Sequence, residues 1–120
     1  MKNFKKLPVW QKGMELATQA HTVRMSFPDT KERYLGHEFQ QIAIRIPANI
    51  AIGSSYENDS DYRSFLRISL GACFELDTLI ILSRNVGLGD ETALSRLSVL
   101  IDEEKKLLMD FIKQLIMKGF

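Results

Sequence analysis

The feature that most constrains this chain is a proline inside a segment that otherwise has the pattern of a buried helix. Pro47 stands in the run Ile46-Pro47-Ala48-Asn49-Ile50-Ala51-Ile52-Gly53, whose isoleucines recur at helical spacing. A proline within a helix removes a backbone donor and clashes with the preceding turn, at a cost of roughly 3 kcal/mol. Helix propensity alone does not favour Pro47 or Asn49, so the segment points to a particular fold. We expect a helix that kinks near Pro47.

Apolar residues at three- and four-residue spacing predict four helices separated by short breaks. The expected spans are Pro8 to Phe27, about Lys31 to Gly53, a third helix from a cap at Asn58, Asp59 or Ser60 to the break at Gly87, and a fourth that Asp90 caps. The first helix is expected to bury Trp10, Met14, Leu16, Ala17, Ala20, Val23 and Phe27.

The fourth helix is the most regular of the four. Its seam consists of Leu94, Leu97, Ile101, Leu108, Phe111 and Leu115, with Glu104 in one seam position. No strand alternation or internal repeat is visible. The fold class predicted is all-α, an up-down four-helix bundle that forms a single domain over residues 1–120.

The composition is that of an ordinary globular protein, with 45% hydrophobic and 26% charged residues and a net charge of +1. No global basic field of the kind found in nucleic-acid binders is present. Four lysines nevertheless precede the first acid, Glu15, and form either a phosphate-contacting arm or a solvated terminus: Lys2, Lys5, Lys6 and Lys12.

The single cysteine, Cys73, cannot form an intramolecular disulfide and is expected to be a buried small hydrophobe. The longest strongly apolar run, Leu79 to Leu82, is far shorter than the ~20 residues that cross a bilayer. We therefore expect a cytoplasmic protein with no membrane contact.

Several apolar residues lie off the expected core stripes: Ile44, Ile52, Leu70, Ile81 and Met109. A lone bundle usually leaves a polar face on each helix. This excess predicts self-association, and the alternative is a set of scattered exposed apolar residues, which are common.

Motifs for catalysis or metal binding are missing. His37-Glu38 lacks the second histidine of a zinc-protease helix, and no glutamate has a histidine three residues later as di-iron bundles require. The acidic segment 57–61 lacks the glycine and distal glutamate of a calcium loop, so helix capping explains it better. We expect no catalytic residues, no metal and no cofactor, and hence no enzyme.

Three polar residues are candidates for burial. Glu75 and Glu104 are expected to be partly buried, with Arg45, Arg63 and Arg67 as possible partners, either to fix the register between helices or as boundary residues that reach solvent. Asn49 is expected to be a core amide that bonds the backbone freed by Pro47.

Five motifs in order resemble a known family: Phe4-x-x-Leu7-x-x-Trp10, Phe27-Pro28, Ile46-Pro47-Ala48-Asn49-Ile50-Ala51-x-Gly53, Phe65-Leu66-x-Ile68 and Gly71-x-x-x-Glu75-Leu76. Together they are similar to the bacterial four-helix bundle proteins encoded within 23S ribosomal RNA intervening sequences. Relatives include the accessory variability determinant of diversity-generating retroelements. The resemblance implies a homo-oligomer, typically a pentameric ring, whose basic surface binds RNA, DNA or a reverse transcriptase. It also marks Pro47, Asn49, Gly53, Gly71 and Glu75 as structural motif residues.

The chain departs from the family pattern at several positions. Ile52 stands where a glutamate is usual, Tyr56 where a basic residue is common, and Arg45 where a small hydroxyl residue is usual. The first two changes together are consistent with an ion pair replaced by an apolar–aromatic contact. Gln40 and Gln41 replace a basic pair, which weakens the transfer of nucleic-acid binding to this chain.

The leading hypothesis is a non-catalytic oligomeric bundle that binds nucleic acid or a nucleic-acid-processing protein. Its candidate contacts are Lys2, Lys5, Lys6 and Lys12, with Arg63 and Arg67 four residues apart on the third helix. The alternative is a scaffold that acts only through protein–protein contacts, which the near-zero net charge favours. A ribosomal structural role is weaker, since ribosomal proteins are usually far more basic.

Overall fold

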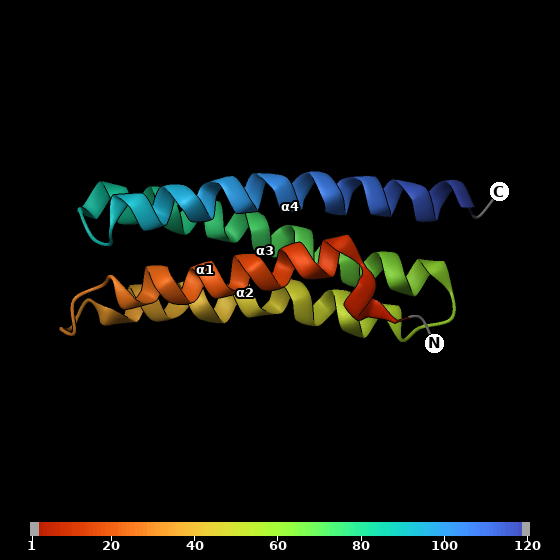
Figure 1. Cartoon of the computed structure of the whole chain (residues 1–120), viewed down its shortest axis with the longest axis horizontal. Coiled ribbons are helices and arrows are strands. Elements are labelled where there is room, and N and C mark those ends of the chain that lie inside the picture. The colour runs from red at the N-terminus through yellow and green to blue at the C-terminus, as the bar shows by residue number, and fades with distance from the viewer. Residues whose placement is uncertain (1–2, 119–120) are drawn as a thin grey trace.

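Four long antiparallel helices form the molecule in the computed structural model, which describes residues 3–118. A short 3-10 turn, η1 (Phe4–Lys6), precedes α1 (Pro8–Met25), α2 (Arg33–Ser54), α3 (Asp59–Val86) and α4 (Glu91–Lys118). Each helix packs on the next, and α4 returns to α1, so the four make a square bundle of 51 × 20 × 19 Å (Figure 1). The predicted up-down four-helix bundle is confirmed.

The helix ends follow the capping chemistry that the sequence predicts. Pro8 occupies the first turn of α1. Asn58 Oδ1 accepts a hydrogen bond of 2.8 Å from the Asp61 amide at the start of α3, and Asp90 Oδ2 accepts one of 2.9 Å from the Ala93 amide at the start of α4. Gly87 ends α3 with a φ of 72°, a left-handed conformation that glycine adopts without strain.

The buried face of α1 differs by one position from the expected stripe. Met14 was expected in the core but is 43% exposed, whereas Val9 and Gly13 are buried. Leu16, Ala20 and Val23 are buried as predicted. The apolar spacing had placed Met14 on the stripe because a glycine gives no hydrophobic signal, although Gly13 is the residue that faces the core.

Helix α2 continues through Pro47, which is buried, and the kink expected there stays a prediction. The expectation for Asn49 was wrong in part. The side chain is half-buried rather than in the core, and its Nδ2 donates to the Arg45 carbonyl at 2.7 Å instead of to the Ala43 carbonyl that Pro47 deprives of a donor. The buried Ser69 hydroxyl donates to the Ile46 carbonyl at 2.8 Å and joins α3 to this segment.

The buried face of α3 begins with two large side chains. Tyr62 and Leu66 are fully buried, while Phe65 is only half-buried and its ring stacks on Tyr56, with the centroids 5.1 Å apart. Cys73 is buried as predicted, and burial raises the pKa of its thiol to about 12. The thiol is therefore a packing group rather than a reactive one.

The seam of α4 is confirmed, including its single acid. Glu104 is fully buried, and neither of its carboxylate oxygens has a hydrogen-bond partner among the described residues. Burial raises the pKa of Glu104 to about 8, an effect that the Lys12 ammonium partly opposes. The carboxyl lies against Gly13 on α1, in a space that a side chain on Gly13 would otherwise fill.

The second candidate acid behaves differently. Glu75 was expected to be partly buried, but its side chain is 51% exposed and forms an ion pair of 2.5 Å with Arg45. Arg45 is thus one of the three partners that the sequence offered, at a site open to solvent. Glu75 is on the outward side of α3 because the buried positions flanking it are Ala72, Cys73 and Leu76.

Candidate nucleic-acid interface

The predicted basic contacts begin at the N-terminal turn. Lys5 and Lys6 are exposed on η1, and Lys2 lies outside the described residues. The turn is held against α1, since Gln11 Nε2 donates to the Lys5 carbonyl at 3.0 Å and the rings of Phe4 and Trp10 meet edge to face at 5.4 Å. The two lysines therefore project from an ordered turn rather than from a loose arm.

Lys12 does not join them in presenting an unpaired charge. Its ammonium lies 3.2 Å from a Glu15 carboxylate oxygen and 3.3 Å from one of Glu103 on α4. The hydrogen bond to Glu15 contributes most to raising the pKa of Lys12. A lysine with two acidic neighbours offers a phosphate less net charge than Lys5 or Lys6 does.

The two arginines of α3 also differ from each other. Arg63 is half-buried and its Nη1 donates to the Leu115 carbonyl near the end of α4, at 3.4 Å. Arg67, one turn further along α3, is exposed and has no acidic partner among residues 3–118. Arg67 is therefore the freer of the two for an outside anion.

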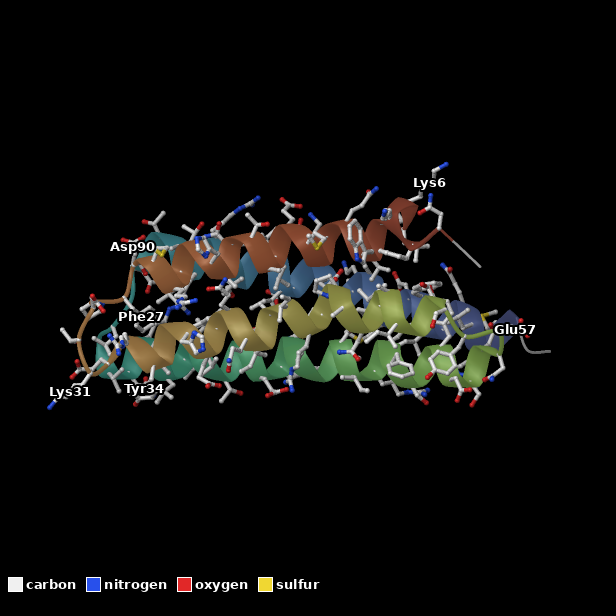
Figure 2. All side chains as sticks on the ribbon, turned by 90° about the horizontal axis from the view of Figure 1, so that it is seen from below. Lys6, Phe27, Lys31, Tyr34, Glu57 and Asp90 are labelled. Atoms are coloured by element: carbon white, nitrogen blue, oxygen red, sulfur yellow. The ribbon has the colours of Figure 1, made fainter. Side chains whose placement is uncertain are left out.

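These basic residues share one end of the bundle with several acids. The N-terminal turn, the α2–α3 connection and the last turns of α4 lie together at the right-hand end of Figure 1, and Figure 2 shows Lys6 and Glu57 at that end. Asp59 and Asp61 follow in the first turn of α3. The predicted contacts thus gather at one end, but as part of a mixed-charge surface.

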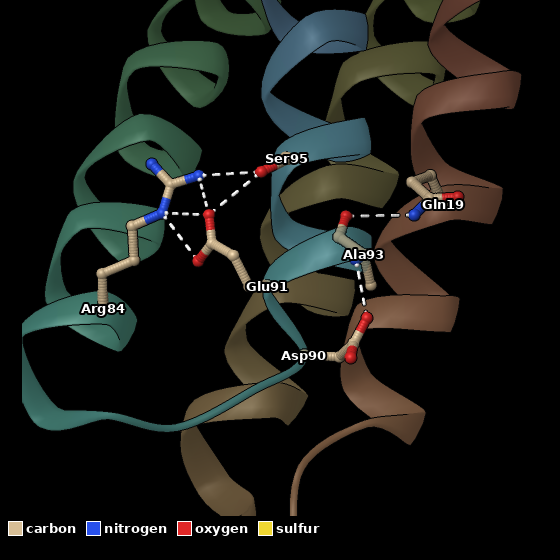
Figure 3. Close-up of polar contacts among 6 residues, drawn as sticks. All are labelled: Gln19, Arg84, Asp90, Glu91, Ala93 and Ser95. Atoms are coloured by element: carbon tan, nitrogen blue, oxygen red, sulfur yellow. Dashed lines mark hydrogen bonds and ion pairs between the residues drawn. The ribbon is translucent and has the colours of Figure 1, made fainter.

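Several cations of the bundle surface are paired with acids. Arg84 contacts Glu91 at 2.8 Å and Ser95 Oγ at 3.3 Å, beside the Asp90 cap and the bond from Gln19 to the Ala93 carbonyl (Figure 3). Arg84 is the largest cause of the lowered pKa of Glu91. Three more pairs follow the same pattern: Arg45 with Glu75, Arg96 with Glu15, and Lys105 with Asp77.

The positions that depart from the family pattern have local partners. Arg24 Nη1 donates to Gln40 Oε1 at 2.7 Å, so Gln40 joins α2 to α1. Tyr56 stacks on Phe65, and a direct contact between Tyr56 and Ile52 stays a prediction. The tighter constraint in this segment is Gly53, where a Cβ would lie 2.9 Å from Tyr62 Cδ1 and 3.0 Å from Phe65 Cβ.

One group of basic residues was missed by the sequence argument. Arg24, Lys31, Arg33 and His37 line a hollow of about 1040 Å³ at the opposite end of the bundle, beside the α1–α2 connection. They are scattered over two helices and a turn, so no short motif marks them. Only the helical hairpin brings them together.

The described residues also bear on metal sites and on membrane-spanning helices. Within residues 3–118 the structure places no three His, Cys, Asp or Glu side chains where they could hold a metal ion. No helix in the same range combines the length and apolar character needed to cross a membrane.

Comparison with models of protein families gives a match that covers most of the chain. The family model described as 23S rRNA-intervening sequence protein matches residues 5–110, nearly the whole chain. A comparison with curated proteins found no match. The matched residues span α1, α2, α3 and most of α4, including the segment around Pro47, and this chain belongs to the 23S rRNA-intervening sequence protein family.

Proposed function

We propose that this protein is a non-catalytic, self-associating bundle that binds nucleic acid or a nucleic-acid-processing protein. The observation that carries the nucleic-acid part is the family match over residues 5–110, because the family is named for an intervening sequence of 23S rRNA. Lys5, Lys6 and Arg67 support it as exposed cations with no carboxylate partner in the described part of the chain. We further propose a cytoplasmic location, which a lone buried cysteine favours.

Self-association is supported by apolar side chains on the outer surface of α2 and α3. These residues, here called the α2–α3 face, are 44–60% exposed: Ile44, Ile52, Ile68, Leu82 and Val86. The contacts Arg45–Glu75 and Tyr56–Phe65 set the register of the two antiparallel helices, and this register places Ile52 across from Ile68. Burial of such a surface by another subunit contributes roughly 25 cal/mol per Å².

Gly71 is a second reason to expect another subunit on the α2–α3 face. It lies inside the 28-residue helix α3, where glycine costs about 1 kcal/mol relative to alanine. Apart from its own stretch of α3, no atom of the described chain lies within 4 Å of the position that a Cβ on Gly71 would take. Packing within the subunit therefore does not require this glycine. The close approach of another backbone would, because a missing side chain lets two helices come together.

A second apolar surface on the other side of α3 favours a ring over a two-fold dimer. Phe74, Ile81, Met109 and Ile116 on α3 and α4 are 41–59% exposed. Contacts between two different surfaces of a subunit are head-to-tail, and they close into a ring when the rotation permits. We propose such a ring, with five subunits as the family resemblance implies. Light scattering on the purified protein tests it, and a monomer at micromolar concentration would remove the idea.

Nucleic-acid binding is tested by fluorescence anisotropy with a structured RNA and a DNA duplex at two salt concentrations. The expected result is salt-sensitive binding that weakens in the variant Lys5→Gln/Lys6→Gln/Arg67→Gln, because each phosphate that is no longer neutralised lowers the slope of log affinity against log salt by about 0.9 for duplex DNA. Equal binding by the variant and the parent would show that these contacts are wrongly assigned.

A protein–protein scaffold is the second candidate. The ion pairs of Lys12, Arg45, Arg84, Arg96 and Lys105 favour it, because they leave much of the side surface close to neutral. An absence of binding to both probes at low salt would favour the scaffold over the nucleic-acid binder.

A further inference from the structure

The hollow at the α1–α2 connection, here called the hairpin hollow, has a rigid floor. Phe27 is 8% exposed and packs close to two glycines, since a Cβ on Gly36 or on Gly89 would lie 3.0 Å from its ring. The Asp90 amide donates to Ser26 Oγ at 3.0 Å and ties the α3–α4 turn to the end of α1. The Phe27 side of the hollow is therefore held by packing within the chain, which lowers the entropy cost of ordering it on binding.

The charge in the hairpin hollow is positive. Arg24, Lys31 and Arg33 line it, and the one carboxylate among its lining residues is Asp29. Figure 2 shows Lys31 at the tip of the connection, pointing away from the helices. A concave surface with an excess of one sign of charge concentrates the field that a counter-ion meets.

The internal partners of these cations leave them available. Arg24 uses one N–H on Gln40, and its other guanidinium donors make no hydrogen bond within residues 3–118. Arg33 and Asp29 lie 3.3 Å apart, but their side chains are 75% and 92% exposed. An exposed pair of this kind contributes little to stability, so Arg33 can exchange Asp29 for a phosphate at small cost.

An aromatic ring stands next to the cations. Tyr34 lines the hairpin hollow and is 66% exposed, so most of its surface is open to solvent. A basic groove beside an exposed aromatic side chain is the combination that single-stranded nucleic acids use, with phosphates on the cations and a base on the ring.

We propose that the hairpin hollow binds a single-stranded segment of nucleic acid, with one phosphate held by Arg24 and Arg33, a further backbone phosphate beside Lys31 at the tip of the connection, and the neighbouring base packed on Tyr34. This inference rests on the proposed nucleic-acid binding and names a surface for it at the end of the bundle opposite to Lys5 and Lys6. The phosphodiester chemistry is shared by RNA and DNA, so both are used as probes.

The first experiment titrates labelled single-stranded RNA and DNA with the parent protein and with the variant Lys31→Gln/Arg33→Gln, and measures binding by fluorescence anisotropy. The matched control, Lys106→Gln/Lys113→Gln, removes the same charge from exposed positions on α4. The hollow variant should bind at least about fivefold more weakly at low salt, with the salt slope reduced by about 0.7 for each phosphate that it no longer neutralises. All four positions are exposed, so each variant should fold, and circular dichroism is used to check this.

The opposite change should strengthen binding. Asp29→Asn removes the acid from the hollow, whereas Glu57→Gln removes an exposed acid at the other end. Tighter binding by Asp29→Asn than by Glu57→Gln is expected. For the ring, Tyr34→Ala should weaken binding and Tyr34→Phe should preserve it, because stacking needs the aromatic face and not the hydroxyl.

The possible outcomes separate this inference from the proposed function. If the parent binds and Lys31→Gln/Arg33→Gln loses no more affinity than the control, the hairpin hollow is not the site, and nucleic-acid binding elsewhere still stands. If the parent binds neither RNA nor DNA even at low salt, both this inference and the nucleic-acid part of the proposed function fall. A selective loss for one of the two probes would identify which nucleic acid the hollow accepts.

Discussion

Gly13 and Glu104 share one position in the core, since a Cβ on Gly13 would lie 2.8 Å from Oε2 of Glu104. The same Cβ would be 3.4 Å from Pro47 Cβ and 3.5 Å from Ile46 Cγ2. Helices α1, α2 and α4 therefore meet where a glycine, a proline and a buried acid interlock. The family motif around Pro47 lies against this junction, which explains why an unusual helix interior can still pack tightly.

Because Gly13 and Glu104 share one position, the effect of Gly13→Ala on stability should change sign when Glu104 is replaced. Gly13→Ala in the parent should lower the free energy of unfolding by about 1 kcal/mol, because a close-packed core resists added atoms. In a Glu104→Val background the same substitution should raise stability by up to about 1 kcal/mol, as helix propensity then dominates. Urea denaturation of the four proteins gives the double-mutant cycle. Equal effects in both backgrounds would show that the residues are not coupled.

Glu104 should also make stability depend on pH. Its pKa is raised to about 8 in the folded protein, from about 4.3 in an unfolded chain, so the folded state binds the extra proton between these values. Stability is therefore greatest below about pH 4 for this group and falls as the pH rises, by up to about 1.4 kcal/mol per pH unit, until it levels off above pH 8.

The other titratable groups near Glu104 do not change their protonation state in this pH range. Lys12 on α1 has a raised pKa, and burial keeps the Cys73 thiol on α3 protonated with a pKa of about 12. On α2, the residues beside the Gly13 position that the Glu104 carboxyl adjoins are Ile46 and Pro47, which do not titrate. Glu104→Gln should thus flatten the unfolding free energy between pH 5 and 8, whereas Asp102→Asn at an exposed neighbouring position should not. Parallel pH profiles for the parent and Glu104→Gln would contradict the assignment.

Much of the fold follows from local sequence rules. The caps at Asn58 and Asp90, the break at Gly87 and the seam of α4 were predictable because each depends on a residue and its neighbours within one or two turns. The burial of Glu104 was predictable in the same way, as it occupies a seam position between Ile101 and Leu108.

The errors occur where a residue's environment depends on another helix. Met14 was favoured over Gly13 because hydrophobicity predicts burial, but Gly13 is buried where the Glu104 carboxyl fills its missing side chain. Glu75 has apolar neighbours in sequence yet is on the solvent side of α3. The hairpin hollow was not predictable either, since Arg24 and His37 come together only through the turn between α1 and α2.

Gly53 is a glycine that packing within the subunit does require. A Cβ there would meet Tyr62 Cδ1 at 2.9 Å, Phe65 Cβ at 3.0 Å and the Tyr62 carbonyl at 3.3 Å, and the last of these is backbone that cannot rotate away. Gly53→Ala should therefore destabilise the bundle by about 1–3 kcal/mol despite its better helix propensity. Thermal and urea unfolding measure the change, and unchanged or increased stability would show that α2 and α3 separate easily at this point.

Gly71→Ala should have the opposite effect on the stability of the subunit. The open space around Gly71 means that alanine should stabilise the isolated subunit by up to about 1 kcal/mol, because glycine is the poorer helix former. If another subunit packs on the α2–α3 face, the added methyl group should separate the two helices and shift the assembly toward smaller species. Urea unfolding at low protein concentration measures the first effect and light scattering at high concentration the second.

The combination of the two results is diagnostic. A protein that becomes more stable as a subunit and weaker as an assembly places the subunit contact at Gly71. Ile68→Asp, one turn away, should also weaken assembly, because it puts a charge where an apolar residue 48% exposed in the subunit would be buried. Lys113→Gln on α4 serves as the surface control. Assembly that is unchanged in both Gly71→Ala and Ile68→Asp would exclude this face as the interface and leave the apolar residues between α3 and α4 as the remaining candidate.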